Sequence, residues 1–294
     1  MHNKVSKTVS LVLSSGGARG FAHVGVIRAL QHHGFRVGAV AGTSMGALVG
    51  GIFASGHLDA FQTWAKTLDK MEVLKMTDFS ISTKGLVKGD RIIRKLKEIV
   101  PQRRIEELEL PFVAVATDIL NGTEVVFREG DLFEAIRASI SIPTVFKPVR
   151  RGKAYLVDGG LLNPIPVDHI QRTDNDLLVV VDVNAPIPPR VQTKQGAHEE
   201  SSQHSELIER IRTKLAELIP VRQHEDLGIF NLSNKSIQTM MRRISEFTLE
   251  KYRPDLVIRL SRDAFGAFEF YNAEAIMMEG EAIAHGQIAE WLKE

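Results

Sequence analysis

Short apolar segments rich in β-branched residues alternate along this chain with segments of helical periodicity. Apolar runs of four to eight residues between turn residues are typical of strands. The segment LLVVVDV, residues 177–183, is apolar almost throughout, as expected of a strand covered on both faces. We therefore predict an α/β fold, a three-layer sandwich in which helices flank a mostly parallel central sheet.

The predicted elements cover most of the chain outside one polar segment, and no internal repeat is visible. The predicted strands are Val9–Leu13, Val37–Gly42, Phe112–Thr117, Glu124–Arg128, Leu177–Val183 and Leu256–Leu260. The predicted helices are Ala22–His33, Met45–Ser55, Asp59–Leu68, Asp90–Val100, Leu132–Ser139 and Ala273–Leu292.

Composition limits the class of protein. The 294 residues are 44% hydrophobic and 25% charged, which suffices for a sizeable core. A net charge of +1 does not favour nucleic acid as a partner. The absence of cysteine removes disulfides and thiolate chemistry. The start lacks the apolar stretch of a signal peptide, and no run of 18 apolar residues occurs, so we expect a cytoplasmic protein.

The segment 186–253 differs from the rest and is predicted to be a helical insertion in a single domain spanning residues 1–294. It opens with the Pro-rich, polar stretch APIPPRVQTKQGAHEESSQHS. Two amphipathic helices are expected after it. Their apolar faces are formed by Leu207, Ile208, Ile211, Leu215 and Leu218, and by Ile237, Met240, Met241, Ile244 and Phe247. They either pack on the domain or form a mobile cap or membrane-facing element.

The first of three glycine-centred motifs is SSGGARG, residues 14–20, between a predicted strand and a predicted helix. A Walker phosphate loop would end in Gly-Lys-Ser/Thr, whereas Phe21 and Ala22 follow Gly20. The dinucleotide pattern G-x-G-x-x-G is incomplete because position 15 is serine. An oxyanion hole built from backbone N–H groups and a tight turn without a ligand remain as interpretations.

The second motif is GTSMG, residues 42–46, which matches Gly-x-Ser-x-Gly. Gly42 and Gly46 allow a strand and a helix to approach closely, and Ser44 is placed on the sharp bend between them. The preceding VGAVAG and the following ALVGGIFASG provide the strand and the small-residue helix that this elbow requires. Ser44 is therefore the candidate nucleophile.

The third motif is Asp158-Gly159-Gly160 within AYLVDGGLLNPIPV. An acid at a strand end followed by two glycines makes a turn that a ligand or another backbone segment can approach. Considered alone, the motif favours an ordinary Asp-Gly hairpin turn. Asn163 and the prolines at 164 and 166 indicate a rigid loop.

Together, LSSGGARGFAHVGVIRAL, GTSMGALVGG, ASISIPTVFKPV and DGGLLNPIPV resemble, in this order, the signature blocks of the patatin-like phospholipases. The resemblance covers roughly residues 9–185. It implies a serine lipid acyl hydrolase with a Ser–Asp dyad: Ser44 as nucleophile, Asp158 as base, and an oxyanion hole from Gly16, Gly17, Ala18 and Arg19. Ser15 stands where the family usually has the first glycine of its loop.

The implied dyad needs no histidine, metal or organic cofactor. We expect His23 beside the oxyanion loop and His169 on the surface, in a helix. A free aspartate with a pKa near 3.9 is a weak base, so we expect burial to raise the pKa of Asp158.

The substrates implied are acyl esters of phospholipids, lysophospholipids or acylglycerols. Alternatives are a thioesterase or general carboxylesterase with the same dyad, or a non-catalytic regulator on the same fold. The expected partner is a lipid, with peripheral membrane contact and homodimer formation left open.

Overall fold

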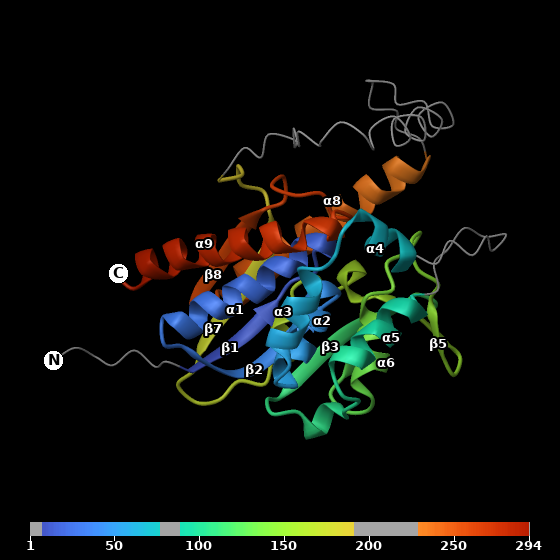
Figure 1. The fold of residues 1–294 in the computed structure, drawn as a ribbon, viewed down its shortest axis with the longest axis horizontal. Coiled ribbons are helices and arrows are strands. Elements are labelled where there is room, and N and C mark those ends of the chain that lie inside the picture. Colours follow the sequence, from blue (N-terminus) through green and yellow to red (C-terminus); the bar gives the residue numbers. More distant parts are fainter. Residues whose placement is uncertain (1–7, 77–88, 191–228, 294) are drawn as a thin grey trace. The chain divides into compact units, whose positions relative to one another are not determined.

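The computed structural model describes residues 8–76, 89–190 and 229–293 (Figure 1). The described residues within 1–190 and 240–294 form one compact unit, and those within 191–239 belong to a second. The predicted amphipathic helix around 207–218 lies outside the described residues. The second predicted helix lies within α8 (Ile229–Tyr252).

The larger unit contains one eight-stranded sheet with the pairing order β5-β6-β3-β2-β1-β7-β8, and β4 pairs with β3 outside this path. Strands β1, β2, β3, β7 and β8 pair in parallel, whereas β4, β5 and β6 pair antiparallel. This arrangement confirms the predicted mostly parallel sheet. The bounds are β1 Thr8–Leu13, β2 Arg36–Thr43, β3 Phe112–Asp118, β4 Thr123–Phe127, β5 Val149–Arg151, β6 Ala154–Asp158, β7 Leu177–Ala185 and β8 Leu256–Ser261.

Strand β3 pairs with three strands although a strand has only two edges. Strand β4 pairs along residues 114–118, so β2, at 112–115, and β6, at 116–118, share the opposite edge. Thr43 ends β2 opposite Val115, and Asp158 ends β6 opposite Ala116. The ends of two strands distant in sequence therefore meet at neighbouring positions of β3.

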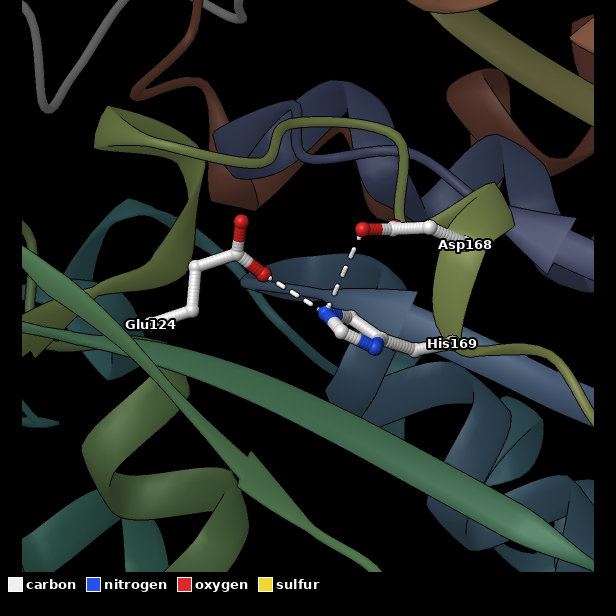
Figure 2. Close-up of side chains that lie close together, drawn as sticks. All are labelled: Glu124, Asp168 and His169. Carbon is white, nitrogen blue, oxygen red and sulfur yellow. Dashed lines mark hydrogen bonds and ion pairs between the residues drawn. The ribbon is translucent and has the colours of Figure 1, made fainter.

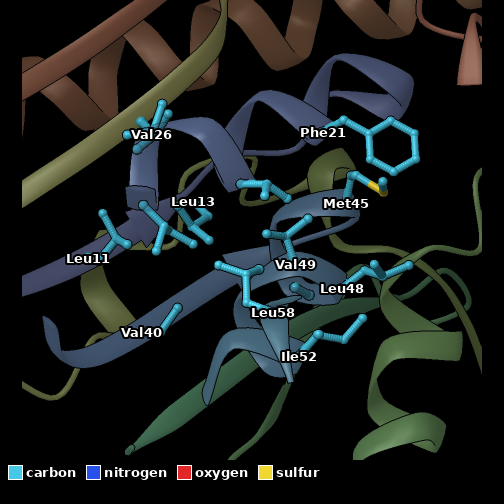
Figure 3. Close-up of a cluster of buried hydrophobic side chains, with 14 of the residues drawn as sticks. Leu11, Leu13, Phe21, Val26, Val40, Met45, Leu48, Val49, Ile52 and Leu58 are labelled. Carbon is cyan, nitrogen blue, oxygen red and sulfur yellow. The ribbon is translucent and has the colours of Figure 1, made fainter. Parts of the chain in front are cut away.

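Helices cover one face of the sheet, where α1 and α9 run side by side over the central strands (Figure 1). The hydrophobic cluster on this face includes Leu11 and Leu13 of β1, with side chains of α1 and α2 (Figure 3). The helix bounds are α1 Ala22–His32, α2 Met45–Ala54, α3 Leu58–Ala65, α4 Lys70–Met76, α5 Asp90–Ile99, α6 Leu132–Ser139 and α9 Ala273–Trp291.

The opposite face carries a smaller cluster, in which Val12 of β1 and Val180 of β7 pack with Ile165 and Val167. Leu249, in the last turns of α8, contacts this cluster. Because successive strand residues point to opposite faces, Val12 lies on one side of the sheet and its neighbours Leu11 and Leu13 lie on the other. Apolar packing on both faces explains the continuous apolar run of β7.

Three elements were not predicted, namely α4 and the strands β5 and β6. Helix α4 buries none of its seven residues, so it has no clear apolar face to detect. Strand β5 is only three residues long and reads VRR. Helix α4 and strand β5 therefore lack the apolar periodicity on which prediction from sequence depends.

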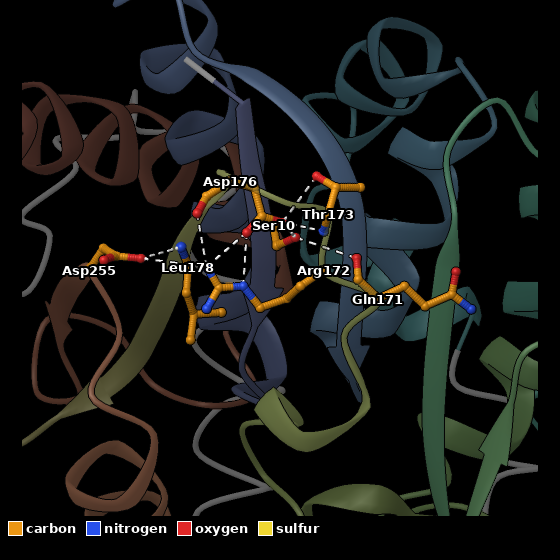
Figure 4. Close-up of polar contacts among 7 residues, drawn as sticks. All are labelled: Ser10, Gln171, Arg172, Thr173, Asp176, Leu178 and Asp255. Carbon is orange, nitrogen blue, oxygen red and sulfur yellow. Dashed lines mark hydrogen bonds and ion pairs between the residues drawn. The ribbon is translucent and has the colours of Figure 1, made fainter. Parts of the chain in front are cut away.

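A polar network ties together the ends of β1, β7 and β8 away from the glycine motifs (Figure 4). At its centre, the Asp176 carboxylate accepts hydrogen bonds from Ser10 Oγ, from Thr173 N at 2.9 Å and from Arg172 Nε at 2.8 Å. Burial raises the pKa of Asp176, but these bonds outweigh burial and lower it below the usual range. Asp255 accepts from Leu178 N at 2.6 Å.

We expect Asp176→Ala to lower the free energy of unfolding by about 2–4 kcal/mol, because it leaves buried donors without an acceptor. Urea denaturation measures the loss. The matched control is Asp255→Ala, whose side chain is 44% exposed and for which we expect about 1 kcal/mol. Equal losses for the two variants would contradict the central role of Asp176.

Candidate active site

Ser44 lies on a sharp turn between β2 and α2, with φ 58° and ψ −125°. A non-glycine residue in this region costs of order 1–3 kcal/mol and persists only where its surroundings hold it. The Ser44 amide donates to Ser139 Oγ at 2.8 Å, and Ser139 Oγ donates to the Val115 carbonyl at 2.6 Å. The turn is thus held by α6 and β3.

Gly46 allows the first turn of α2 to pack directly on the end of β1. A Cβ at this position would lie 2.2 Å from the Leu13 carbonyl oxygen and 2.6 Å from that of Ser14. Gly42 faces the same turn, since a Cβ there would lie 2.4 Å from the Gly46 carbonyl. Both glycines therefore have the close-packing role that the motif predicted.

Asp158 ends β6 in a buried position, 5% exposed. Its amide donates to the Ser141 carbonyl at 2.9 Å, and its Oδ1 accepts from Gly160 N at 2.8 Å. Burial raises the pKa of Asp158 to about 6, although the Ser44 side chain and the Gly160 amide act to lower it. Asp158 Oδ2 has no hydrogen-bond partner among the described residues, so the contact between the Ser44 side chain and this oxygen falls short of hydrogen-bond geometry.

The end of α6 and the residues just after it support both Ser44 and Asp158. Ser139 Oγ holds the amide of Ser44, and the Ser141 carbonyl holds the amide of Asp158. The block ASISIPTVFKPV was noted in the sequence, but no single role was assigned to its serines. That role depends on which carbonyl and amide groups the fold brings near them.

The predicted oxyanion-hole residues, in the glycine loop between β1 and α1, differ in whether their backbone amides are already hydrogen-bonded. Within the described residues, the amides of Gly16 and Gly17 donate to no protein group. The Ala18 amide instead donates to the Ala267 carbonyl at 2.8 Å, so it is not available to an oxyanion. This corrects the prediction for Ala18, because the turn that contributes Ala267 is remote in sequence. Gly17 has φ 56°, which favours glycine.

The Arg19 side chain holds the glycine loop through three hydrogen bonds. Its guanidinium donates to the carbonyls of Arg262 and Phe265, at 3.0 and 3.3 Å, and to Asn184 Oδ1 at 2.7 Å. Asn184 Nδ2 in turn donates to the Ser15 carbonyl at 2.5 Å. The Arg19 side chain therefore fastens the loop to β7 and to the turn after β8.

His23 lies against the same loop, as predicted. Its Nε2 is 2.9 Å from the Ser14 carbonyl, an acceptor, so Nε2 carries the proton. Burial lowers the pKa of His23 to about 4, which keeps the ring neutral at physiological pH. This geometry gives His23 a role in positioning the loop.

Asn163 connects the loop after Asp158 to β2. Its amide donates to the Gly159 carbonyl at 2.9 Å, and its own carbonyl accepts from Thr43 Oγ1 at 2.8 Å. Gly159 passes close to β3, since a Cβ there would lie 2.2 Å from the Val115 carbonyl oxygen. These contacts tie the loop to β2 and pack it against β3.

The side chains of Glu124, Asp168 and His169 lie together beside this loop (Figure 2). His169 Nε2 is 2.7 Å from Glu124 Oε2, and Asn163 Nδ2 donates to Glu124 Oε2 at 3.1 Å and to Asp168 Oδ1 at 2.7 Å. The carboxylates of Glu124 and Asp168 therefore each accept hydrogen bonds from neighbouring side chains. The helical position predicted for His169 is confirmed, since it ends a 3₁₀ helix (Val167–His169), but its side chain is half-buried beside Glu124 instead of exposed on the surface.

Helix α8 reaches the loop through Met241, whose Cε would lie 2.6 Å from a Cβ on Gly160. The predicted apolar face is divided in the structure. Met241 and Ile244 are half-buried, whereas Met240 and Phe247 are 58% and 53% exposed. Among the helices that the structure describes, none has the length and apolar character needed to cross a membrane.

In this α/β fold, a serine lies on a strained strand-to-helix turn, and a buried carboxylate ends the adjoining strand. The chain belongs to the patatin-like phospholipase family, which its sequence matches over residues 11–170. Family membership supports a lipid hydrolase activity.

Two relatives illustrate the similarity. An uncharacterized NTE family protein of Mycobacterium tuberculosis (strain ATCC 25618 / H37Rv) is 33% identical over 326 residues, which cover 95% of this chain and 91% of the relative. Patatin-like phospholipase domain-containing protein 6 of Mus musculus is 30% identical over 185 residues, which cover 60% of this chain and 14% of the relative.

Two solved structures show similarity at low identity. VipD from Legionella pneumophila aligns with a TM-score of 0.47 and 16% identity, covering 98% of this chain and 67% of that one. A chain of the heterodimeric ExoU–SpcU complex from Pseudomonas aeruginosa aligns with a TM-score of 0.48 and 14% identity, covering 98% and 52%.

Proposed function

We propose that this protein hydrolyses acyl esters of lipids through an acyl-serine intermediate, with Ser44 as nucleophile and Asp158 as base. The observation that carries the proposal is the meeting of β2 and β6 on one edge of β3, which brings the two residues together. A pKa of about 6 leaves Asp158 ionised at neutral pH and makes it a stronger base than a free aspartate.

In the acylation step, Asp158 Oδ2 accepts the Ser44 proton while Oγ attacks the ester carbonyl carbon. The C–O bond to the leaving alcohol then breaks, and Asp158 returns the proton to that alcohol. Water attacks the acyl-serine in the second step, again losing a proton to Asp158, and the fatty acid leaves as Ser44 regains its proton. Asp158 thus returns, within each step, the proton that it takes up.

The amides of Gly16 and Gly17 are the proposed oxyanion donors, because they have no protein acceptor in the described residues. Removal of one oxyanion donor costs about 10²–10³ in kcat in enzymes of known mechanism, so two amides account for several kcal/mol of transition-state stabilisation. The bonds that hold Ser15, Ala18 and Arg19 keep these amides in place before substrate binds.

The proposed substrates are phospholipids, lysophospholipids or acylglycerols, and a thioesterase or general carboxylesterase activity is the alternative. Comparison of phospholipid, acyl-CoA and short-chain ester turnover separates these classes. The proposal includes a cytoplasmic location with peripheral membrane contact, for which the exposed Met240 and Phe247 are available.

The direct test is labelling with a fluorophosphonate probe, alongside hydrolysis of a medium-chain p-nitrophenyl ester. We expect the wild type to be labelled on the peptide that contains Ser44 and to release p-nitrophenol. Ser44→Ala removes both signals, whereas His23→Phe, which deletes both ring nitrogens, keeps a labelled serine. Labelling at another residue, or full hydrolysis by Ser44→Ala, would overturn the assignment.

The Ser15 side chain gives a more specific prediction. Its Oγ is buried without a partner, and a Cβ on Gly160 would lie 3.2 Å from this Oγ and 3.0 Å from Asp158 Oδ1. We expect Ser15→Ala to slow deacylation about tenfold, since one hydrogen bond to the attacking water is lost. The pre-steady-state burst of p-nitrophenol is expected to persist while the steady-state rate falls. Burst and steady-state rates that fall together would show only a structural role, and Ser15→Thr tests rescue.

A further inference from the structure

A pocket of about 370 Å³ lies between α5, α6 and the β5–β6 hairpin, apart from the serine turn. These elements neighbour one another at one end of the sheet (Figure 1). The apolar part of its lining comes from buried rings and aliphatic side chains, including Phe127, Phe133 and Leu156. Ligand pockets in proteins range from about 300 to 1,000 Å³, so this volume suits one small or single-chain ligand.

The polar part of the lining is strongly cationic. Five basic side chains, Arg94, Lys97, Arg137, Arg150 and Arg151, face two acidic ones, Asp90 and Glu134. The net charge of the lining is therefore three positive units, whereas the whole chain carries only +1. A concave surface of one sign concentrates its field and attracts ions of the opposite sign.

Aromatic rings hold two of these cations over the apolar lining. Lys97 Nζ lies 5.5 Å from the centre of the Phe133 ring, and the Arg151 guanidinium lies 5.0 Å from that of Phe127. In the described part of the chain, no ion pair involves Arg94, Lys97, Arg150 or Arg151. Their charges are thus available to a ligand without the loss of an existing ion pair.

We propose that this pocket binds an anionic amphiphile, a single acyl chain that ends in a carboxylate or a phosphate. The aromatic lining suits the chain, and the arginines suit the head group, because guanidinium groups match carboxylate and phosphate oxygens in pairs. The choice of an acyl chain rests on the proposed lipid hydrolase function, whereas the charge argument is independent of it.

The pocket is connected to the serine turn through α6. Arg137, which lines the pocket, donates to Ser141 Oγ at 2.6 Å, and the Ser141 carbonyl accepts from the Asp158 amide at 2.9 Å. Ser139, at the end of the same helix, holds the Ser44 amide. A released fatty acid anion, or a lysophospholipid whose head group binds here, would therefore lie one helix away from the dyad.

The test is isothermal titration calorimetry of the full chain in a Ser44→Ala background, which prevents turnover. The probes are hexadecanoate, hexadecyl phosphate and hexadecanol, below their aggregation concentrations. We expect at least one of the two anions to bind at least tenfold more tightly than the alcohol. Whichever of the two anions binds more tightly shows whether the pocket prefers the carboxylate of a fatty acid or a phosphate head group.

Variants then locate the binding site. Arg94→Glu/Arg150→Glu is expected to weaken anion binding at least tenfold and to leave hexadecanol unchanged, whereas Glu134→Lys strengthens anion binding. The matched control is Arg103→Glu/Lys153→Glu, which reverses two exposed cations that do not line the pocket. Equal weakening in the control, no gain from Glu134→Lys, or equal affinity for hexadecanol and both anions would overturn the proposal.

This experiment separates the pocket from the proposed function. Binding is measured without catalysis, so an inactive wild-type protein that binds hexadecanoate through these arginines would contradict only the dyad. An active protein whose anion affinity is unchanged by the arginine substitutions would contradict only the proposed anion binding in the pocket.

Discussion

Asp158→Asn is expected to lower kcat/KM for a p-nitrophenyl ester by about 10²–10⁴-fold, the range that a general base contributes. The amide that replaces the carboxylate cannot accept the Ser44 proton at Oδ2. The wild type should lose activity as pH falls through about 6, since protonation of Asp158 removes the base. The pH profile of kcat/KM measures this loss of activity at low pH, and the variant's profile should not show it.

Stability provides the control for this variant. The pKa of Asp158 is raised in the folded protein, so its ionised carboxylate destabilises the folded state relative to the unfolded state, and this cost is complete above about pH 6. Asp158→Asn should therefore raise the free energy of unfolding at pH 8 by roughly 1–3 kcal/mol, and the gain should vanish below pH 4. A variant that retains most of its activity would place the base elsewhere and restore a histidine mechanism as the alternative.

Gly46→Ala is expected to lower the free energy of unfolding by about 1–3 kcal/mol and activity by roughly 10²-fold. The added methyl group would lie within 2.6 Å of two carbonyl oxygens of the β1 end, and backbone atoms at this position cannot rotate away. The first turn of α2 must shift, and Ser44 shifts with it. Thermal unfolding and ester hydrolysis measure the two effects.

The matched control is Gly286→Ala, also within a helix, in α9. A Cβ at Gly286 meets no atom within 4 Å. Because alanine is the better helix former, we expect this variant to gain about 0.5–1 kcal/mol at unchanged activity. If Gly46→Ala behaved like Gly286→Ala, the close packing of α2 on β1 would not be what holds the serine turn.

Much of the parallel sheet was predictable because its strands are buried on both faces and are therefore continuously apolar. The predicted Phe112–Thr117 and Leu177–Val183 match β3 and β7 to within two residues at each end. The β5–β6 hairpin was missed although it contains Asp158, because its outer strand is short and charged. Apolar periodicity in a sequence follows burial, and none of the three residues of β5 is buried.

The glycine motifs also located the loops of the candidate site. What they did not show is which amides the loops leave unpaired. The Ala18 amide donates to the Ala267 carbonyl, and the Ser44 amide donates to Oγ of Ser139, 95 residues away. Such pairings depend on hydrogen bonds between segments remote in sequence, which leave no signature in a single motif.

Taken by itself, the sequence determined the α/β class, the elbow at Ser44 and the acid at Asp158, because strand periodicity and glycine-dependent turns are local properties. Only the tertiary structure decided that β2 and β6 end side by side on β3, that burial raises the pKa of Asp158, and that five cations gather around one apolar pocket. Each of these depends on distances between segments far apart in the chain, and the energies of charges and hydrogen bonds depend on those distances.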